Sequence, residues 1–212
     1  MARVLVIGAS RGIGLETVNR ALEVGHHVRA FARSASRIGV AHPQLEIIVG
    51  DALEAAAVGA AIEGQDAVIQ TLGADAFLSK VETFSRATRI LVDAMTAKGP
   101  RRLLSVTGFG AGETRGRGGL LYDFFVMPLV LKRVYDDKDV QERIIRSSGL
   151  DWTIVRPGYL TNRPFTGRID VIEDPARWRL GSISRKDVAA YLVGAIADEA
   201  SVGKAVVLAQ RR

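Results

Sequence analysis

The chain has 212 residues, of which 48% are hydrophobic and 25% are charged. This size and composition suit one soluble domain and exclude a disordered chain. Because there is no Cys, a disulfide scaffold, a thiolate metal site and a Cys nucleophile are excluded. The three His residues, at positions 26, 27 and 42, lack metal-binding spacing, so we expect no metal site.

The net charge of +6 suits a polyanionic ligand. Lys and Arg are spread along the chain, without the interleaved aromatic residues on which single-strand binders stack bases. We therefore expect no nucleic-acid partner. A dinucleotide is a smaller polyanion that the same charge could serve.

The chain begins "MARVLVIGAS" and becomes Gly-rich before a long apolar run develops, so we expect no signal peptide. The most apolar later segment, Leu120 to Val134, is interrupted by Asp123, Pro128 and Lys132. It is too short to span a bilayer. We expect no membrane partner and a cytoplasmic location.

Short β-branched runs alternate with helical patterns along nearly the whole chain. The predicted strands are 3–8, 26–33, 45–51, 66–73, 101–108, 151–157, 168–172 and 204–209. The predicted helices are 12–25, 52–64, 79–98, one in the stretch that begins at Val134, and 185–198. The alternation predicts a single α/β domain over residues 1–212, with a Rossmann-like, doubly wound, mostly parallel sheet flanked by helices.

Two segments are expected to shape a substrate mouth, at about 110–133 and 159–182. The first contains "GAGETRGRGG", from Gly110 to Gly119, which predicts a flexible loop. Both segments carry Arg residues that would suit an acidic acceptor, although solvated loop charges explain them equally well: Arg115, Arg117, Arg163 and Arg168.

The turn "GASRGIG" lies between the first predicted strand and the first helix. In that context Gly8 allows the tight turn, Gly12 lets the backbone approach a pyrophosphate, and Gly14 lets the helix pack against the strand. The N–H groups at the start of the helix would bind the pyrophosphate. The other expected cofactor contacts in this turn are Ser10, Arg11 and Ile13.

The end of the second strand indicates which dinucleotide binds. An acid there would accept from a ribose 2′-hydroxyl, whereas an Arg would pair with a 2′-phosphate. The segment "FARSASR" offers Arg33, Ser34 and Arg37 and no carboxylate, and Arg11 could reach the same phosphate. We expect NADP(H) rather than NAD(H). The alternative is that Arg33 and Arg37 are solvated loop charges.

Other strand ends should also line the cofactor, because ligands of open parallel sheets bind beyond the carboxyl ends of the strands. Asp51 and Ala52 would face the adenine, although Asp51 could instead cap the following helix. The remaining expected contacts follow the fourth and sixth strands: Thr71, Leu72, Gly73, Pro157 and Gly158.

Three stretches, "VGDALEAAAVGAAIEGQDAVIQTLG", "SSGLDWTIVRPG" and "ISRKDVAAYLVGAI", resemble the atypical short-chain dehydrogenases. Within that group the flavin reductase (biliverdin-IXβ reductase) family is the most similar. Its R-x-S-S-R segment corresponds to Arg33, Ser34, Ser36 and Arg37, with Ala35 in place of a Ser. The resemblance implies a Rossmann-like fold, NADPH, and hydride transfer to flavins or other planar conjugated acceptors. We expect a small-molecule acceptor of flavin, quinone-like or tetrapyrrole-like chemistry, and a monomer or weak homodimer.

The resemblance also assigns residues near the nicotinamide. Such proteins commonly carry a Ser after the fifth strand, where this chain has "SVTGFG": Thr107 keeps a hydroxyl, and Gly108 stands at the matching Ser position. A His of flavin reductases corresponds to Tyr159 in "RPGYL". The candidate catalytic residues are therefore Thr107, Lys138 and Tyr159, with Thr107, Gly108 and Lys138 also expected to contact the cofactor.

The stretch "VYDDKDVQER" departs from the family's Tyr-Lys pair. Lys138 aligns with the Lys of the family's pair. Val134, which has no proton to donate, then stands at the position of the family's catalytic Tyr. On a helix Tyr135 points about 100° away from Val134. It is either a displaced acid or a residue that packs on its neighbours. Lys138 is either a ribose ligand or a solvated Lys that pairs with Glu142.

A cofactor cleft without an acid suits an acceptor that can take its proton from water. The sequence therefore predicts an NADPH-dependent oxidoreductase acting on a flavin or a similar planar acceptor. The alternative is a non-catalytic NADP(H)-binding sensor or partner-binding protein of the same fold. A sugar-nucleotide epimerase or dehydratase is a weaker candidate, because little chain is left for a substrate lobe.

Overall fold

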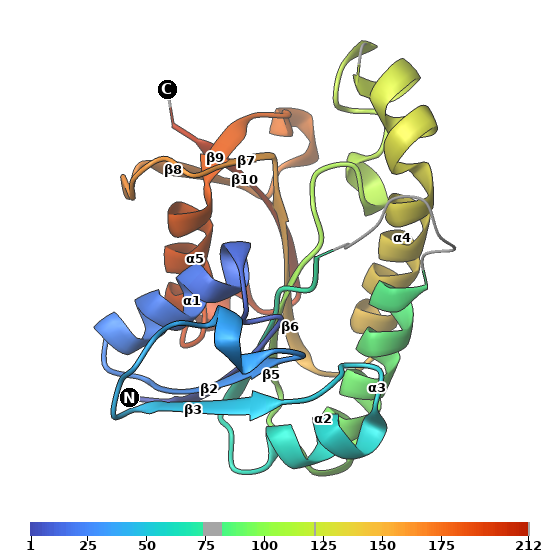
Figure 1. The fold of residues 1–212 in the computed structure, drawn as a ribbon. Coiled ribbons are helices and arrows are strands. Elements are labelled where there is room, and N and C mark those ends of the chain that lie inside the picture. Colours follow the sequence, from blue (N-terminus) through green and yellow to red (C-terminus); the bar gives the residue numbers. More distant parts are fainter. Residues whose placement is uncertain (74–81, 121, 212) are drawn as a thin grey trace.

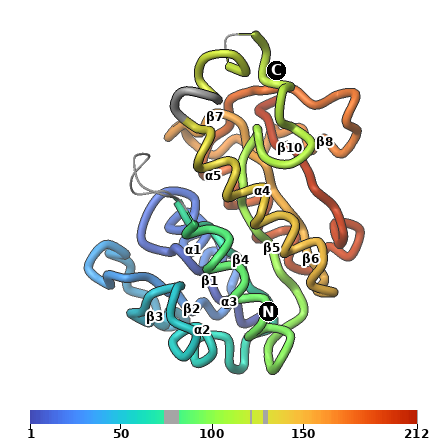
Figure 2. Tube along the Cα trace, turned by 90° about the vertical axis from the view of Figure 1, so that its right-hand side faces the viewer, coloured from blue at the N-terminus to red at the C-terminus, as the bar shows by residue number. Residues whose placement is uncertain are grey.

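The computed structural model describes residues 1–73, 82–120 and 122–211, with the backbone alone at 128–130. Its main sheet has eight strands in the order β3-β2-β1-β4-β5-β6-β10-β8. Neighbouring strands pair in parallel except at the β10–β8 edge. The strands are β1 (Arg3–Ile7), β2 (His27–Ala32), β3 (Leu45–Val49), β4 (Ala67–Gln70), β5 (Arg102–Val106), β6 (Asp151–Pro157), β8 (Ile169–Ile172) and β10 (Lys204–Gln210). Figure 2 shows this succession from β3 at one edge to β8 at the other.

Helices cover both faces of the sheet (Figure 1). One face carries α1 (Gly12–Glu23) and α5 (Arg185–Gly194), and the other carries α2 (Ala55–Ile62), α3 (Thr83–Lys98) and α4 (Lys132–Arg146). Side chains alternate between the faces along each strand. In β1, for example, Val4 and Val6 belong to the core under α1 and α5, whereas Leu5 and Ile7 belong to the core on the opposite face. The predicted doubly wound, mostly parallel α/β fold is confirmed.

Several predicted boundaries differ from the structure. β4 ends at Gln70, not at residue 73, and α5 ends at Gly194, not at residue 198. Past the end of α5, the side chain of Arg102 donates to the carbonyls of Ala195, at 2.6 Å, and Ile196, at 3.3 Å. The expected start of the third helix, at 79–81, lies outside the described residues.

The expected flexible loop at 110–119 is held against α4, contrary to that prediction. The Gly112 N–H donates to the Asp139 carboxylate at 2.7 Å, and the guanidinium of Arg115 pairs with Asp136 at 3.0 Å and Asp139 at 2.7 Å. Arg115 is thus neutralised by α4, and its charge is not available to an acidic acceptor.

The sequence missed two features around this loop and the end of the sheet. A π-helix, Tyr122–Leu131, leads into α4, and a small second sheet pairs β7 (Tyr159–Thr161) in parallel with β9 (Ser182–Ser184). The remaining elements are short 3-10 turns: Ala35–Arg37, Gly112–Thr114, Pro175–Arg177 and Glu199–Ser201. None of the described helices has an apolar stretch long enough to cross a bilayer.

Candidate functional site

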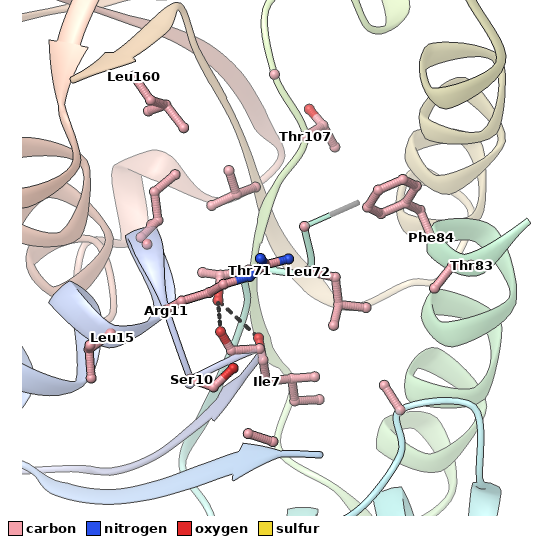
Figure 3. Close-up of a pocket in the computed structure, with 18 of the residues that line it drawn as sticks. Ile7, Ser10, Arg11, Leu15, Thr71, Leu72, Thr83, Phe84, Thr107 and Leu160 are labelled. Atoms are coloured by element: carbon pink, nitrogen blue, oxygen red, sulfur yellow. Dashed lines mark hydrogen bonds between the residues drawn. The ribbon is translucent and has the colours of Figure 1, made fainter. Parts of the chain in front are cut away.

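A cleft of about 950 Å³ opens at the carboxyl ends of the central strands. Strand order reverses at β1, which has β2 on one side and β4 on the other. A crevice forms at such a point because the connections that leave the two neighbouring strands cross to opposite faces of the sheet. Figure 3 shows Thr83 and Phe84 of α3 across this cleft from Arg11 and Leu160.

The turn from Gly8 to Gly14 forms the floor of the cleft where α1 begins. Gly8 and Gly12 have φ values of +88° and +58°, a left-handed region that favours glycine. A Cβ on Gly14 would overlap the carbonyl of Gly8, so the close packing predicted for Gly14 is present. The Thr71 hydroxyl donates to the Ile7 carbonyl at 2.9 Å and joins this turn to the end of β4 (Figure 3).

The N-terminus of α1 faces the same cleft. Its N-cap residue, Arg11, has an extended backbone and makes no side-chain cap to the helix. The first N–H groups of a helix without such a cap can donate to a ligand, and the helix dipole favours an anion there. The turn and the helix together form a cradle suited to a pyrophosphate.

The cleft brings together the cofactor contacts predicted from the sequence, with Gly14 beneath it. The lining includes Gly8, Ser10, Arg11, Gly12, Ile13, Arg33, Ser34, Arg37, Asp51, Ala52, Thr71, Leu72, Gly73, Thr107, Gly108, Lys138, Pro157 and Gly158. These residues come from the ends of six strands, from the start of α1 and from α4, so only the fold places them side by side.

Arg33, Ser34 and Arg37 lie at one end of the cleft, after β2. Asp51, after β3, accepts the backbone N–H of Leu53 at 2.9 Å, while the N-cap residue of α2 is Glu54. Asp51 therefore closes the turn before α2 and does not cap the helix, so that alternative is wrong.

Lys138 lies at the other end of the cleft and is buried, with 7% of its surface exposed. Its ammonium donates to the Thr107 carbonyl at 2.6 Å and lies 4.3 Å from the centre of the Phe84 ring. Burial lowers the pKa of Lys138 to about 8, although the charges of Glu142 and Asp137 act to raise it. The alternative of a solvated Lys is wrong.

The hydroxyl of Thr107 has a different partner. It donates to the Glu142 carboxylate at 2.8 Å, and the same carboxylate accepts two hydrogen bonds from the guanidinium of Arg156, at 3.0 and 2.5 Å. Arg156 also pairs with Glu113. The Thr107 proton is thus committed to a buried ion-pair network.

Val134 and Tyr135 both line the cleft, as residues of α4. Burial raises the pKa of the Tyr135 hydroxyl above its ordinary value. Tyr159, which the sequence placed near the nicotinamide, does not line the cleft. Its side chain is 54% exposed, and its ring meets that of Tyr122 edge to face at 6.1 Å between centroids.

The sequence missed several residues that line the cleft. The most informative is Arg185, at the start of α5: its guanidinium donates to the Asn162 side chain at 2.7 Å, and its Nε lies 3.8 Å from the point where a Cβ on Gly12 would stand. Arg185 reaches the glycine turn because α5 packs against α1. Other missed residues include Glu16, Thr83, Phe84, Leu131, Leu160 and Asn162.

Comparison with known proteins shows which proteins this chain resembles. The model of a family described as NAD(P)H-binding matches residues 8–199. An uncharacterized chloroplastic protein of Arabidopsis thaliana is 32% identical over 224 residues, which cover 99% of this chain and 77% of that protein.

Two solved structures share the architecture over nearly their whole length. A Rossmann-fold NAD(P)-binding protein from Shigella flexneri is 28% identical, with a TM-score of 0.74 and coverage of 99% of this chain and 94% of the other. ChuY, described as an anaerobilin reductase of Escherichia coli O157:H7, is 24% identical, with a TM-score of 0.82 and coverage of 98% and 97%.

Proposed function

Since the chain belongs to the NAD(P)H-binding family, we propose that it is an NADPH-dependent reductase that transfers hydride to a flavin or a similar planar conjugated acceptor. One observation carries the proposal. The cleft is lined by the strand ends expected to bind a cofactor, but α4 presents Val134, which has no proton to donate, at the end where the nicotinamide would lie. Such a site suits acceptors that do not need an embedded acid.

The residues of the cleft fit a dinucleotide. The uncapped start of α1 and the left-handed glycines give backbone N–H groups room to hold a pyrophosphate. Arg185, whose Nε lies near Gly12, would add a positive charge beside that group. A Cβ at Gly12 would intrude on the same space.

Arg33 and Arg37 support the choice of NADPH over NADH. Both line the cleft beyond β2, and Ser34 lies between them with its hydroxyl 2.9 Å from that of Ser36. Guanidinium groups bind phosphate through charge-assisted hydrogen bonds, whereas a ribose 2′-hydroxyl would call for a carboxylate at this place.

NADPH, when bound, supplies a hydride to the acceptor. Lys138 and the ends of β5 and β6 would hold the nicotinamide half at the deep end of the cleft. Because the Thr107 proton is committed to Glu142 and Val134 has none, we assign the second step, protonation of the reduced acceptor, to water. The description of ChuY as an anaerobilin reductase supports a reductase function.

The proposal is tested by mixing purified protein with NADPH and, in turn, FMN, riboflavin, a quinone and biliverdin, while the loss of NADPH absorbance is followed. We expect steady consumption with at least one acceptor. Binding of NADPH without turnover of any of them would overturn the reductase proposal. It would favour instead a non-catalytic NADP(H)-binding protein, for which the absent acid is the supporting observation.

A further inference from the structure

Position 108 has no side chain, yet the space beside it is filled. Gly108 lines the cleft just after β5 and has a φ of +139°. The hydroxyl oxygen of Tyr135 lies 2.8 Å from the point where a Cβ on Gly108 would stand. The Tyr135 hydroxyl therefore occupies the place that a short polar side chain at position 108 would take.

A second glycine makes room for the same Tyr. A Cβ on Gly110 would stand 3.1 Å from Cε1 of the Tyr135 ring and 3.1 Å from the Tyr122 hydroxyl. The ring of Tyr135 thus lies against the backbone of 108–110, and its hydroxyl is directed toward the edge of the cleft that Gly108 lines. α4 contributes Tyr135 to the nicotinamide end together with Lys138.

Neighbouring polar groups at this end already have partners. The Thr107 hydroxyl donates to Glu142 at 2.8 Å, the Tyr122 hydroxyl donates to the Phe109 carbonyl at 3.1 Å, and the Lys138 ammonium donates to the Thr107 carbonyl. Val134 offers only methyl groups. The Tyr135 hydroxyl hydrogen-bonds to that of Tyr122 and also lines the cleft, where it can exchange this partner for an acceptor molecule.

We infer that Tyr135 is a catalytic residue which donates a hydrogen bond to a carbonyl oxygen or ring nitrogen of the acceptor, from the place that Gly108 leaves open. The inference rests on the proposed reductase function and specifies its substrate as a planar molecule with a polar acceptor atom on the edge that faces β5. The hydrogen bond stabilises the negative charge that develops on this atom as hydride arrives.

The chemistry of Tyr135 fits a donor of a hydrogen bond and not a source of the transferred proton. Because burial raises its pKa, the hydroxyl stays protonated through the neutral range. The overall reaction remains balanced: NADPH gives a hydride with two electrons, water gives one proton, and the acceptor gains both.

The test compares Tyr135→Phe with wild-type protein in two assays. We expect the binding of FMN, or of the best acceptor found, to NADP⁺-loaded protein to weaken, and kcat/KM for that acceptor to fall, by roughly tenfold or more. NADPH affinity, measured by calorimetry, should stay within about twofold. Tyr191→Phe removes a hydroxyl from α5, in the core on the other face of the sheet, and should change neither value.

Each outcome decides the inference. An unchanged acceptor affinity and kcat/KM in Tyr135→Phe, or an equal loss of NADPH affinity, overturns it. If wild-type protein binds an acceptor without reducing it, the reductase proposal fails. The role of Tyr135 is then still tested by comparing the acceptor affinities of wild-type protein and Tyr135→Phe. If wild-type protein binds no acceptor, both are overturned.

A double-mutant cycle tests the geometry separately. Gly108→Ala introduces a Cβ against the Tyr135 hydroxyl and also strains a left-handed backbone, so it should lower the midpoint of thermal unfolding. In a Tyr135→Phe background the steric part of this loss disappears, and Gly108→Ala should cost less. Additive losses would show that the hydroxyl is not where the structure places it.

Discussion

The ammonium of Lys138 donates a hydrogen bond of 2.6 Å to the backbone carbonyl of Thr107 and so joins α4 to the chain just beyond β5. The same ammonium lies over the ring of Phe84, at the start of α3. Lys138 thus connects three elements at the deep end of the cleft. It does so while buried, which is costly for a charged group.

The cost of burying Lys138 gives a prediction about stability and pH. Its pKa falls from 10.5 to about 8 on folding, so between these values the unfolded chain binds more protons than the folded one. The free energy of unfolding of wild-type protein, relative to Lys138→Met, should therefore rise with pH across that window and stay constant below it. Denaturant titrations of both proteins from neutral pH to about 10.5 measure the difference, in which other groups cancel. A difference that does not change with pH would contradict the burial of a charged Lys138.

The ion-pair network that includes Thr107 predicts that removing the charge of Glu142 lowers the free energy of unfolding much more than removing the charge of Glu113. Glu142→Gln leaves the fully buried Arg156 without its main counter-charge and should lower the free energy of unfolding by about 3–5 kcal/mol. Glu113→Gln is the matched control. Glu113 pairs with the same guanidinium but is largely exposed, so its loss should be below about 1 kcal/mol. Equal losses in the two denaturation curves would contradict the arrangement.

Arg33 predicts cofactor selectivity. Arg33→Ala would remove the proposed charge-assisted contact to the 2′-phosphate, worth about 1.5–3 kcal/mol, and should weaken NADPH binding by roughly tenfold to a hundredfold. NADH carries no such phosphate and should lose little. Calorimetric titrations of both cofactors measure the ratio, and equal losses for NADPH and NADH would refute the phosphate contact.

For Arg185 we expect no selectivity between NADPH and NADH, because its side chain lies near Gly12 and not beyond β2. Arg185→Gln should weaken NADPH and NADH by the same factor, roughly tenfold, since both carry the pyrophosphate. The neighbouring exposed Lys186, changed to Gln, is the control and should leave both affinities unaltered. A loss confined to NADPH would place Arg185 at the 2′-phosphate, and no loss would remove it from the cofactor site.

The features that the sequence predicted correctly depend on short local patterns. The β-branched runs and the turn at Gly8 to Gly14 each report on a few neighbouring residues, and the rule for open parallel sheets then placed the strand ends in one crevice. Arg185 and Phe84 were missed because their place in the cleft depends on how α5 packs on α1 and how α3 begins. No local signal encodes those contacts.

The errors near the mouth also have physical causes. The run at Tyr122–Leu131 contains Pro128, which normally interrupts an α-helix, so no sequence pattern indicated a π-helix there. The glycines of 110–119 suggested mobility, but Asp136 and Asp139 of α4 fix that loop through Arg115 and Gly112. Tyr159 was chosen by alignment alone, and the pairing of β7 with β9 places it outside the cleft.

The central proposal, hydride transfer from NADPH to a planar acceptor, is tested most directly by anaerobic mixing of NADPH-loaded protein with FMN, and then with a quinone and biliverdin in turn. We expect the absorbance of one oxidised acceptor to fall in step with that of NADPH, one molecule of acceptor for each NADPH consumed. If NADPH binds but neither its absorbance nor that of any acceptor changes, the protein is not a reductase of this class.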